Sequence, residues 1–300
     1  MTYASKGSED KNLRTADWEI DFYSRPIIES DGKKRWELLI SSTQDFSGEE
    51  PFRWEKKCPA NEVNSIWLSS ALKEALKEAF NQGWESPKKL RCWRSSMKTM
   101  IKKAAEKVGI EVVESRRTFS LLEWFSERER NVYPKETGYI SGPIAPQAPI
   151  SIINDPTPLP EALRGDALSF SFMKLGDLRE AREWPMGFNS LIPIRKSLND
   201  SIEIPGLRLF SKSRALPLSA WLAGLEPVRL LIVKNQLILE AGQEDRWLVT
   251  DMTKDSAKNA KENLLIAKEQ GEGLQFIAIQ KSPEEKKFAG FWMLRDVEGF

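Results

Sequence analysis

The sequence predicts an α/β protein of two domains, and its length, its mixed periodicity and one proline-rich break all indicate this fold class. The 300 residues are about twice the length of a typical domain. Segments with strand-like alternation of apolar and polar residues are interspersed with segments of helical spacing. Residues 136–163 hold six prolines and no Lys or Arg, which is typical of an extended linker. We therefore expect domains at 15–135 and 164–300, joined by a linker at 136–163.

The first predicted element is a hairpin. Residues 18–23 and 35–40 have the alternation of half-buried strands, and Asp31-Gly32 between them is a strong signal for a tight turn. Further strands are expected at 52–56, 89–93 and 110–113.

Three helices are expected between and after these strands. The first should begin near Asn61 or Asn64, because Asn is a favoured N-cap, and the second near Ser95 or Ser96. Gly109 should end the second helix, and a third is predicted at 119–130. The resulting order, β-β-β-α-β-α-β-α, is typical of a mixed sheet with helices of the ribonuclease-H-like fold.

The C-terminal domain is predicted to be a second α/β domain whose topology the pattern leaves open. Lys234-Asn235 should form a tight turn between two strands, and one amphipathic helix is expected at about 254–269. Strands are predicted at 168–173, 207–211, 229–233, 236–240, 247–250, 274–279 and 288–294.

Composition excludes several classes of site. The chain has no His, which removes His-based nucleophile systems, His metal sites and His pH switches. The two cysteines, Cys58 and Cys92, cannot form a four-ligand zinc site, and no phosphate-binding glycine motif occurs. We expect no cofactor, no metal and no catalytic residue. The start of the chain lacks an apolar signal segment and no apolar run is long enough to insert into a membrane, so we expect a cytoplasmic protein.

Acidic residues leave a nuclease as an alternative. A ribonuclease-H-like enzyme needs several carboxylates around two metal ions, and Asp21 on the first strand, with Glu74 or Glu78, offers candidates. Asp45 and Glu55 offer the acids of a restriction-type nuclease. The fourth strand, however, carries arginines where a further acid is needed, which disfavours metal binding.

A basic cluster is the stronger candidate site. Between residues 86 and 117, ten Lys or Arg residues face three Glu, although the whole chain has a net charge of only +1. Cations bind phosphates and an aromatic ring stacks on a base, which is the usual combination for single-stranded nucleic acid. Lys98 and Lys102 should share one helix face, whereas Arg91 with Trp93, and Cys92 with Arg94, should point to opposite faces of their strand. The predicted nucleic-acid-binding residues are Lys88, Lys89, Arg91, Trp93, Arg94, Lys98 and Lys102. The alternative is that the lysines are merely solvated and that Trp93 belongs to the core.

Three segments resemble the Tab-two/Atab-two family of cyanobacteria, algae and plants. They are WEIDFYSRP at 18–26 with the return KRWEL at 34–38, EPVRL at 226–230 running to LEAG at 239–242, and GFW at 290–292. The resemblance implies a factor that binds A/U-rich leader RNA and supports synthesis of photosystem subunits, best known for photosystem I. Without a transit peptide, it implies a cyanobacterial member in the cytosol, with association to thylakoids left open. Arg25, in the first segment, joins the predicted RNA-binding residues.

We therefore expect a non-enzymatic factor that binds single-stranded RNA, an mRNA leader, for translation and assembly of photosystem subunits, with translation or assembly proteins as further partners. Two alternatives remain at this stage: a metal-dependent nuclease that uses Asp21 with Asp45 or Glu55, and a protein-interaction scaffold for photosystem assembly.

Overall fold

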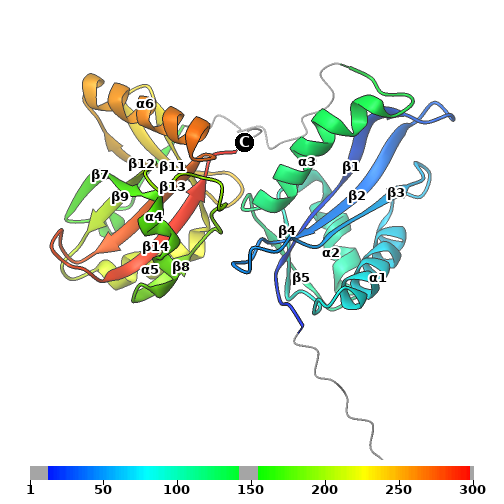
Figure 1. Ribbon diagram of the computed structural model, residues 1–300, viewed down its shortest axis with the longest axis horizontal. Helices are drawn as coiled ribbons and strands as arrows, with labels where there is room; N and C mark the ends of the chain where they lie inside the picture. The colour runs from blue at the N-terminus through cyan, green and yellow to red at the C-terminus, as the bar shows by residue number, and fades with distance from the viewer. Residues whose placement is uncertain (1–12, 142–154, 298–300) are drawn as a thin grey trace, which may run out of the picture.

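A computed structural model describes residues 13–141 and 155–297. Two lobes stand side by side, the N-terminal one built on a five-stranded sheet of order β3-β2-β1-β4-β5 (Figure 1). Strands β1, β2 and β3 are antiparallel neighbours, whereas β1, β4 and β5 run parallel, which matches the predicted ribonuclease-H-like arrangement. The strands are β1 (Trp18–Ile28), β2 (Lys34–Ser42), β3 (Arg53–Cys58), β4 (Lys89–Cys92) and β5 (Glu111–Glu114).

The helices α1 (Ser65–Asn81) and α2 (Lys98–Glu106) cover one face of this sheet, and α3 (Phe119–Asn131) covers the other. Ile20, Leu38 and Ile40 pack in the core beneath α1 and α2, whereas the alternate residue Leu39 packs with Phe125 of α3. The sheet is therefore buried on both faces, and α3 lies on the side toward the C-terminal lobe (Figure 1).

The two predicted helix starts differ in outcome. Asn64 caps α1 as expected, because its side chain accepts hydrogen bonds from the backbone N–H groups of Ile66 and Trp67, each at 2.9 Å. The prediction that Ser95 or Ser96 caps the second helix is wrong. These residues form a short 3₁₀ turn, Ser95–Met97, and α2 begins after it without a side-chain cap.

The C-terminal lobe contains two sheets. One has the order β7-β9-β13-β14-β8 and the other the order β10-β11-β12-β6, a topology that the sequence pattern left open. Its strands are β6 (Thr157–Pro158), β7 (Ala167–Lys174), β8 (Met186–Ser190), β9 (Glu203–Phe210), β10 (Pro227–Val233), β11 (Gln236–Ala241), β12 (Asp245–Asp251), β13 (Leu274–Gln280) and β14 (Phe288–Arg295).

The helices of this lobe are α4 (Leu175–Arg179), α5 (Ala215–Leu225) and α6 (Lys254–Gln270). The lobe also has 3₁₀ turns at Glu161–Leu163 and Ala181–Glu183, and the N-terminal lobe has one at Tyr133–Lys135. Leu218 and Leu222 of α5 pack in one core with Leu230 and Ile277, so that core joins both sheets. The sequence analysis missed β6, β8, α4 and α5. The strands β6 and β8 are short, and α5 is apolar on nearly all sides and so has weak helical periodicity.

The ends of the predicted linker are fastened to the two lobes. Gly138 accepts a hydrogen bond from the N–H of Ile28 in β1 at 2.8 Å, and the N–H of Ile140 donates to Pro26 at 2.9 Å. At the other end, β6 pairs with β12, and Leu159 is buried. The middle of the predicted linker, 142–154, lies outside the described residues.

Candidate functional site

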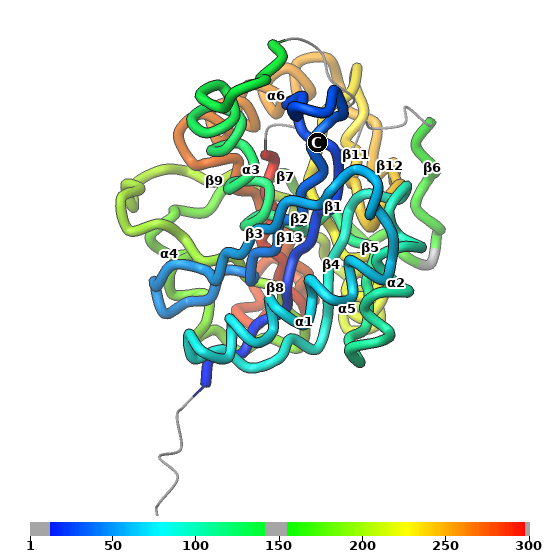
Figure 2. The backbone as a smooth tube through the Cα atoms, turned by 90° about the vertical axis from the view of Figure 1, so that its right-hand side faces the viewer, coloured from blue at the N-terminus to red at the C-terminus, as the bar shows by residue number. Residues whose placement is uncertain are grey.

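Four of the predicted RNA-binding residues are exposed lysines: Lys88, Lys89, Lys98 and Lys102. We call these four residues the lysine face. Lys89 begins β4 opposite Glu111 of β5, and α2 runs back from the far end of β4 to the start of β5. Figure 2 views the N-terminal lobe from the side that carries α2. Lys98 forms an ion pair with Glu114, and its side chain stays 46 % exposed. The lysine face therefore presents positive charge to solvent along α2 and the start of β4.

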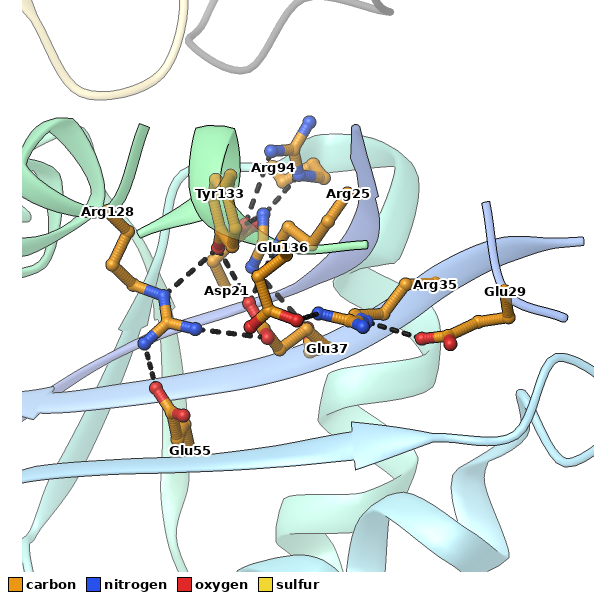
Figure 3. A network of polar contacts seen from close by, with 10 residues as sticks. All are labelled: Asp21, Arg25, Glu29, Arg35, Glu37, Glu55, Arg94, Arg128, Tyr133 and Glu136. Carbon is orange, nitrogen blue, oxygen red and sulfur yellow. Dashed lines mark hydrogen bonds and ion pairs between the residues drawn. The ribbon is translucent and has the colours of Figure 1, made fainter. Parts of the chain in front are cut away.

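Arg25 and Arg94, in contrast, lie inside the protein (Figure 3). Arg25 Nη1 donates to the carboxylate of Asp21 at 2.8 Å, and Arg94 Nε donates to the other oxygen of that carboxylate at 2.8 Å. Burial by itself raises the pKa of Asp21, but the Arg94 and Arg25 guanidinium groups outweigh it and hold this pKa below its usual value. Both arginines are buried and bound to this carboxylate, so neither presents its charge to a phosphate.

Glu37 extends this buried network toward α3 (Figure 3). Its carboxylate accepts hydrogen bonds from Arg25 Nε at 3.3 Å, Arg128 Nη2 at 3.1 Å and the Tyr133 hydroxyl at 2.6 Å. Burial, and the adjacent Glu37, raise the pKa of the Tyr133 hydroxyl. The network therefore ties β1 and β2 to the end of α3 through charges that are removed from water.

Trp93 is also buried, with 5 % of its surface exposed, and the guanidinium of Arg94 lies 4.1 Å from its ring centre. Trp93 follows the end of β4, and strand alternation stops there. The prediction that Arg94 shares a strand face with Cys92 is wrong: Cys92 lies in the core under α1 and α2, whereas Arg94 reaches Asp21. For Trp93, the structure favours the core alternative over an exposed stacking platform.

Arg91 is engaged at the contact between the two lobes. It forms ion pairs with Asp17, at 3.2 Å, and with Glu226 of the C-terminal lobe. Thus Arg25, Arg91, Trp93 and Arg94 hold the fold together, and the sequence prediction that they line one surface with the lysines is corrected.

The candidate acids of the nuclease alternative are also occupied. Asp21 pairs with two arginines, Glu55 with Arg128, and Glu74 with Lys56 at 2.6 Å. Asp45 accepts hydrogen bonds from Ser47. Within residues 13–141 and 155–297 no group of three His, Cys, Asp or Glu is placed to hold a metal ion. The geometry therefore gives the nuclease alternative no support.

A second polar cluster fixes the two lobes to each other. Arg116 Nη2 donates to the buried carboxylate of Glu240 at 2.6 Å, and Arg229 Nε donates to the same carboxylate at 2.9 Å. Arg117 donates to Ser190 Oγ at 2.9 Å and to the carbonyl of Met293 at 3.1 Å. The sequence analysis counted Arg116 and Arg117 only as members of the basic cluster, because a partner more than 70 residues away leaves no local signal.

Glu19 lies beneath this contact and is 2 % exposed. One carboxylate oxygen accepts a hydrogen bond from the N–H of Leu121, in the first turn of α3, at 2.7 Å. Burial raises the pKa of Glu19 to about 8, although the hydrogen bond from Leu121 and the positive charge of Arg91 both lower this pKa. The contact between the lobes therefore holds a carboxyl group that is protonated at neutral pH.

These features define a two-domain α/β protein with an exposed basic surface. The sequence profile described as "RNA-binding protein Tab2/Atab2 N terminal" matches residues 17–128, and "RNA-binding protein Tab2/Atab2, C-terminal domain" matches 147–295. The chain therefore belongs to the Tab2/Atab2 family of RNA-binding proteins, as the resemblance to the Tab-two/Atab-two family predicted.

Two curated plant proteins are similar over almost the whole chain. The chain is 34 % identical over 308 aligned positions to the chloroplastic TAB2 homolog of Zea mays, covering 99 % of this chain and 75 % of the maize protein. It is 32 % identical over 312 positions to the chloroplastic TAB2 homolog of Arabidopsis thaliana, covering 99 % and 78 %. No solved structure gives a significant match. None of the helices in the described residues is both long and apolar enough to span a membrane.

Proposed function

We propose that the protein binds single-stranded, A/U-rich RNA in an mRNA leader through the lysine face, and that it catalyses no reaction. The binding supports translation and assembly of photosystem subunits, photosystem I in particular. The observation that carries the proposal is the exposure of all four lysines in a chain of a family of RNA-binding proteins.

The lysines alone are assigned to RNA contact. Lys98 and Lys102 are four residues apart on α2, about 6 Å along the helix axis, which is close to the spacing of neighbouring phosphates in an extended strand. Arg25, Arg91 and Arg94 are assigned to holding the surface in shape, because each binds a carboxylate and, unlike Lys98, is mostly removed from solvent.

The salt dependence of binding tests the lysine face. Four phosphate contacts on a single strand predict a slope of about −3 in log K against log salt, because each contributes about −0.7. Replacing Lys98 and Lys102 together by Ala should flatten the slope by about 1.4 and weaken all sequences alike. The matched control is Lys254→Ala with Lys258→Ala on α6, again two exposed lysines four residues apart, which should leave the slope unchanged. An unchanged slope in the α2 variant would exclude the lysine face as the site.

The finer parts of the proposal need separate measurements. Affinity for A/U-rich and G/C-rich strands of equal length tests base preference. Crosslinking in cells followed by RNA sequencing identifies the bound leader and separates an RNA-binding factor from a protein-interaction scaffold. Incubation of RNA with the protein and Mg²⁺ or Mn²⁺ tests catalysis, and cell fractionation tests the proposed cyanobacterial cytosol against thylakoid association.

A further inference from the structure

A cavity of about 140 Å³ lies where the two lobes meet. Residues 190–193 of the C-terminal lobe form one wall, and the other walls come from β1, β4 and the start of α3. Cavities for drug-sized ligands measure about 300–1,000 Å³. A volume of 140 Å³ therefore suits a single flat group of one or two rings.

Acidic and basic side chains line the cavity together. Asp17 and Glu19 contribute carboxyl groups, and Arg91 and Arg117 contribute guanidinium groups. An isolated phosphate would meet the carboxyl groups at the same time as the arginines, so the lining disfavours a purely anionic ligand. A neutral ligand that offers both hydrogen-bond donors and acceptors fits this lining better.

Apolar and polar side chains occur together in the cavity wall. Phe119, Leu191 and Pro193 offer apolar surface to the faces of a ring, and Gln44 and Ser190 offer hydrogen-bonding groups to its edge. Proteins recognise unpaired RNA bases in this way, by contact with the ring faces and hydrogen bonds to the exposed edges.

Two of the lining groups retain hydrogen-bonding capacity. Arg117 lies within 4.0 Å of no carboxylate among the described residues, and it donates to the neutral oxygens of Ser190, Met293 and Pro227. Its guanidinium has five N–H donors. Glu19 accepts from the N–H of Leu121 and also interacts with the N–H of Ser120, but its protonated carboxyl group keeps an O–H donor for a base.

We propose that this cavity receives one unpaired base of the RNA strand that the lysine face binds. The proposal rests on the RNA-binding function proposed above and adds a specific base site to it. Lys89 precedes Arg91 by two residues on the same face of β4, about 7 Å along the strand. A base in the cavity therefore leaves its own phosphate within reach of Lys89, the member of the lysine face on this side of the sheet.

The test compares three strands of equal length: the complete RNA, a strand that is abasic at every position, and a strand that keeps one central base. All three carry the same phosphates, so their salt slopes should agree. The single base should raise affinity over the fully abasic strand by roughly 5- to 150-fold, the range expected for a base held by stacking. The effect should depend on which base is kept.

Leu191→Trp fills the cavity and should abolish the gain from the single base while leaving the salt slope unchanged. Leu216→Trp is the matched control, because Leu216 is 58 % exposed on α5 and lies outside the cavity lining. Gln44→Ala, a milder change at a half-exposed residue, should reduce the gain and the discrimination between bases. Melting curves of each variant identify any that fails to fold.

The outcomes separate the two proposals. If the wild-type protein binds none of the strands, the RNA-binding function itself is wrong. If it binds the complete RNA but gains nothing from the single base, or if folded Leu191→Trp keeps the full gain, the base site is wrong and the lysine face stands. If Leu191→Trp does not fold, the single-base measurement on the wild type and Gln44→Ala decide.

Discussion

Replacing Asp21 by Asn should destabilise the protein strongly, because the carboxylate forms ion pairs with two buried guanidinium groups. Asn keeps the size of the side chain and removes only its charge. Arg25 would keep Glu37 at 3.3 Å, but Arg94 would lose its ion pair with Asp21. Removing one partner of a buried ion pair costs about 3–5 kcal/mol, which corresponds to a fall in Tm on the order of 10 °C for a protein of this size.

Thermal and urea unfolding measure this loss, with Asp45→Asn as the control. Asp45 was the second acid of the nuclease alternative, and it contacts only its neighbour Ser47 among the described residues, so the control should unfold like the wild type. The pKa of Asp21 is lowered in the folded protein. Its contribution to stability is therefore present above the unfolded pKa and lost as the pH falls through the folded pKa, and Asp21→Asn should show less acid destabilisation than the wild type.

An unchanged Tm for Asp21→Asn would refute the structural role. If the folded variant also lost a metal-dependent cleavage activity of the wild type, the nuclease alternative would replace our proposal. Adding Arg94→Gln to Asp21→Asn should recover part of the lost stability, because it removes the buried positive charge that had lost its ion pair with Asp21.

The remaining predictions concern burial, pH, the lobe contact and the linker. Trp93→Ala should lower the free energy of unfolding by about 3–5 kcal/mol, as for a core residue, without changing the RNA affinity of folded protein. Glu19 has a raised pKa, so the stability of the wild type should fall as the pH rises from 4.5, the ordinary pKa, to about 8, the folded pKa, and Glu19→Gln should flatten that decline. Glu240→Gln removes the carboxylate that Arg116 and Arg229 share and should cost about 3–5 kcal/mol by urea unfolding. Limited proteolysis should cut within 136–163 and give two resistant fragments, whereas cuts scattered through 60–110 would place the boundary elsewhere.

Features set by neighbouring residues followed from the sequence. The hairpin turn at Asp31-Gly32 appeared as expected, with Gly32 at φ 78°, because the residues at a tight turn must tolerate a left-handed backbone. The order of strands and helices in the N-terminal lobe and the exposure of Lys98 and Lys102 followed from periodicity. Each depends on the spacing of side chains along one element, which is fixed by the geometry of that element.

Features set by distant residues required the tertiary structure. The sequence shows that Arg91, Arg94 and Arg116 are basic, but only the fold brings them to Glu226, Asp21 and Glu240, which are 73 to 135 residues away. Once buried, a charge needs a partner to offset the loss of hydration, so these arginines hold the structure together rather than face RNA. The sequence determined which side chains could bind a strand, and packing within the N-terminal lobe and between the two lobes decided which of them stay exposed to do so.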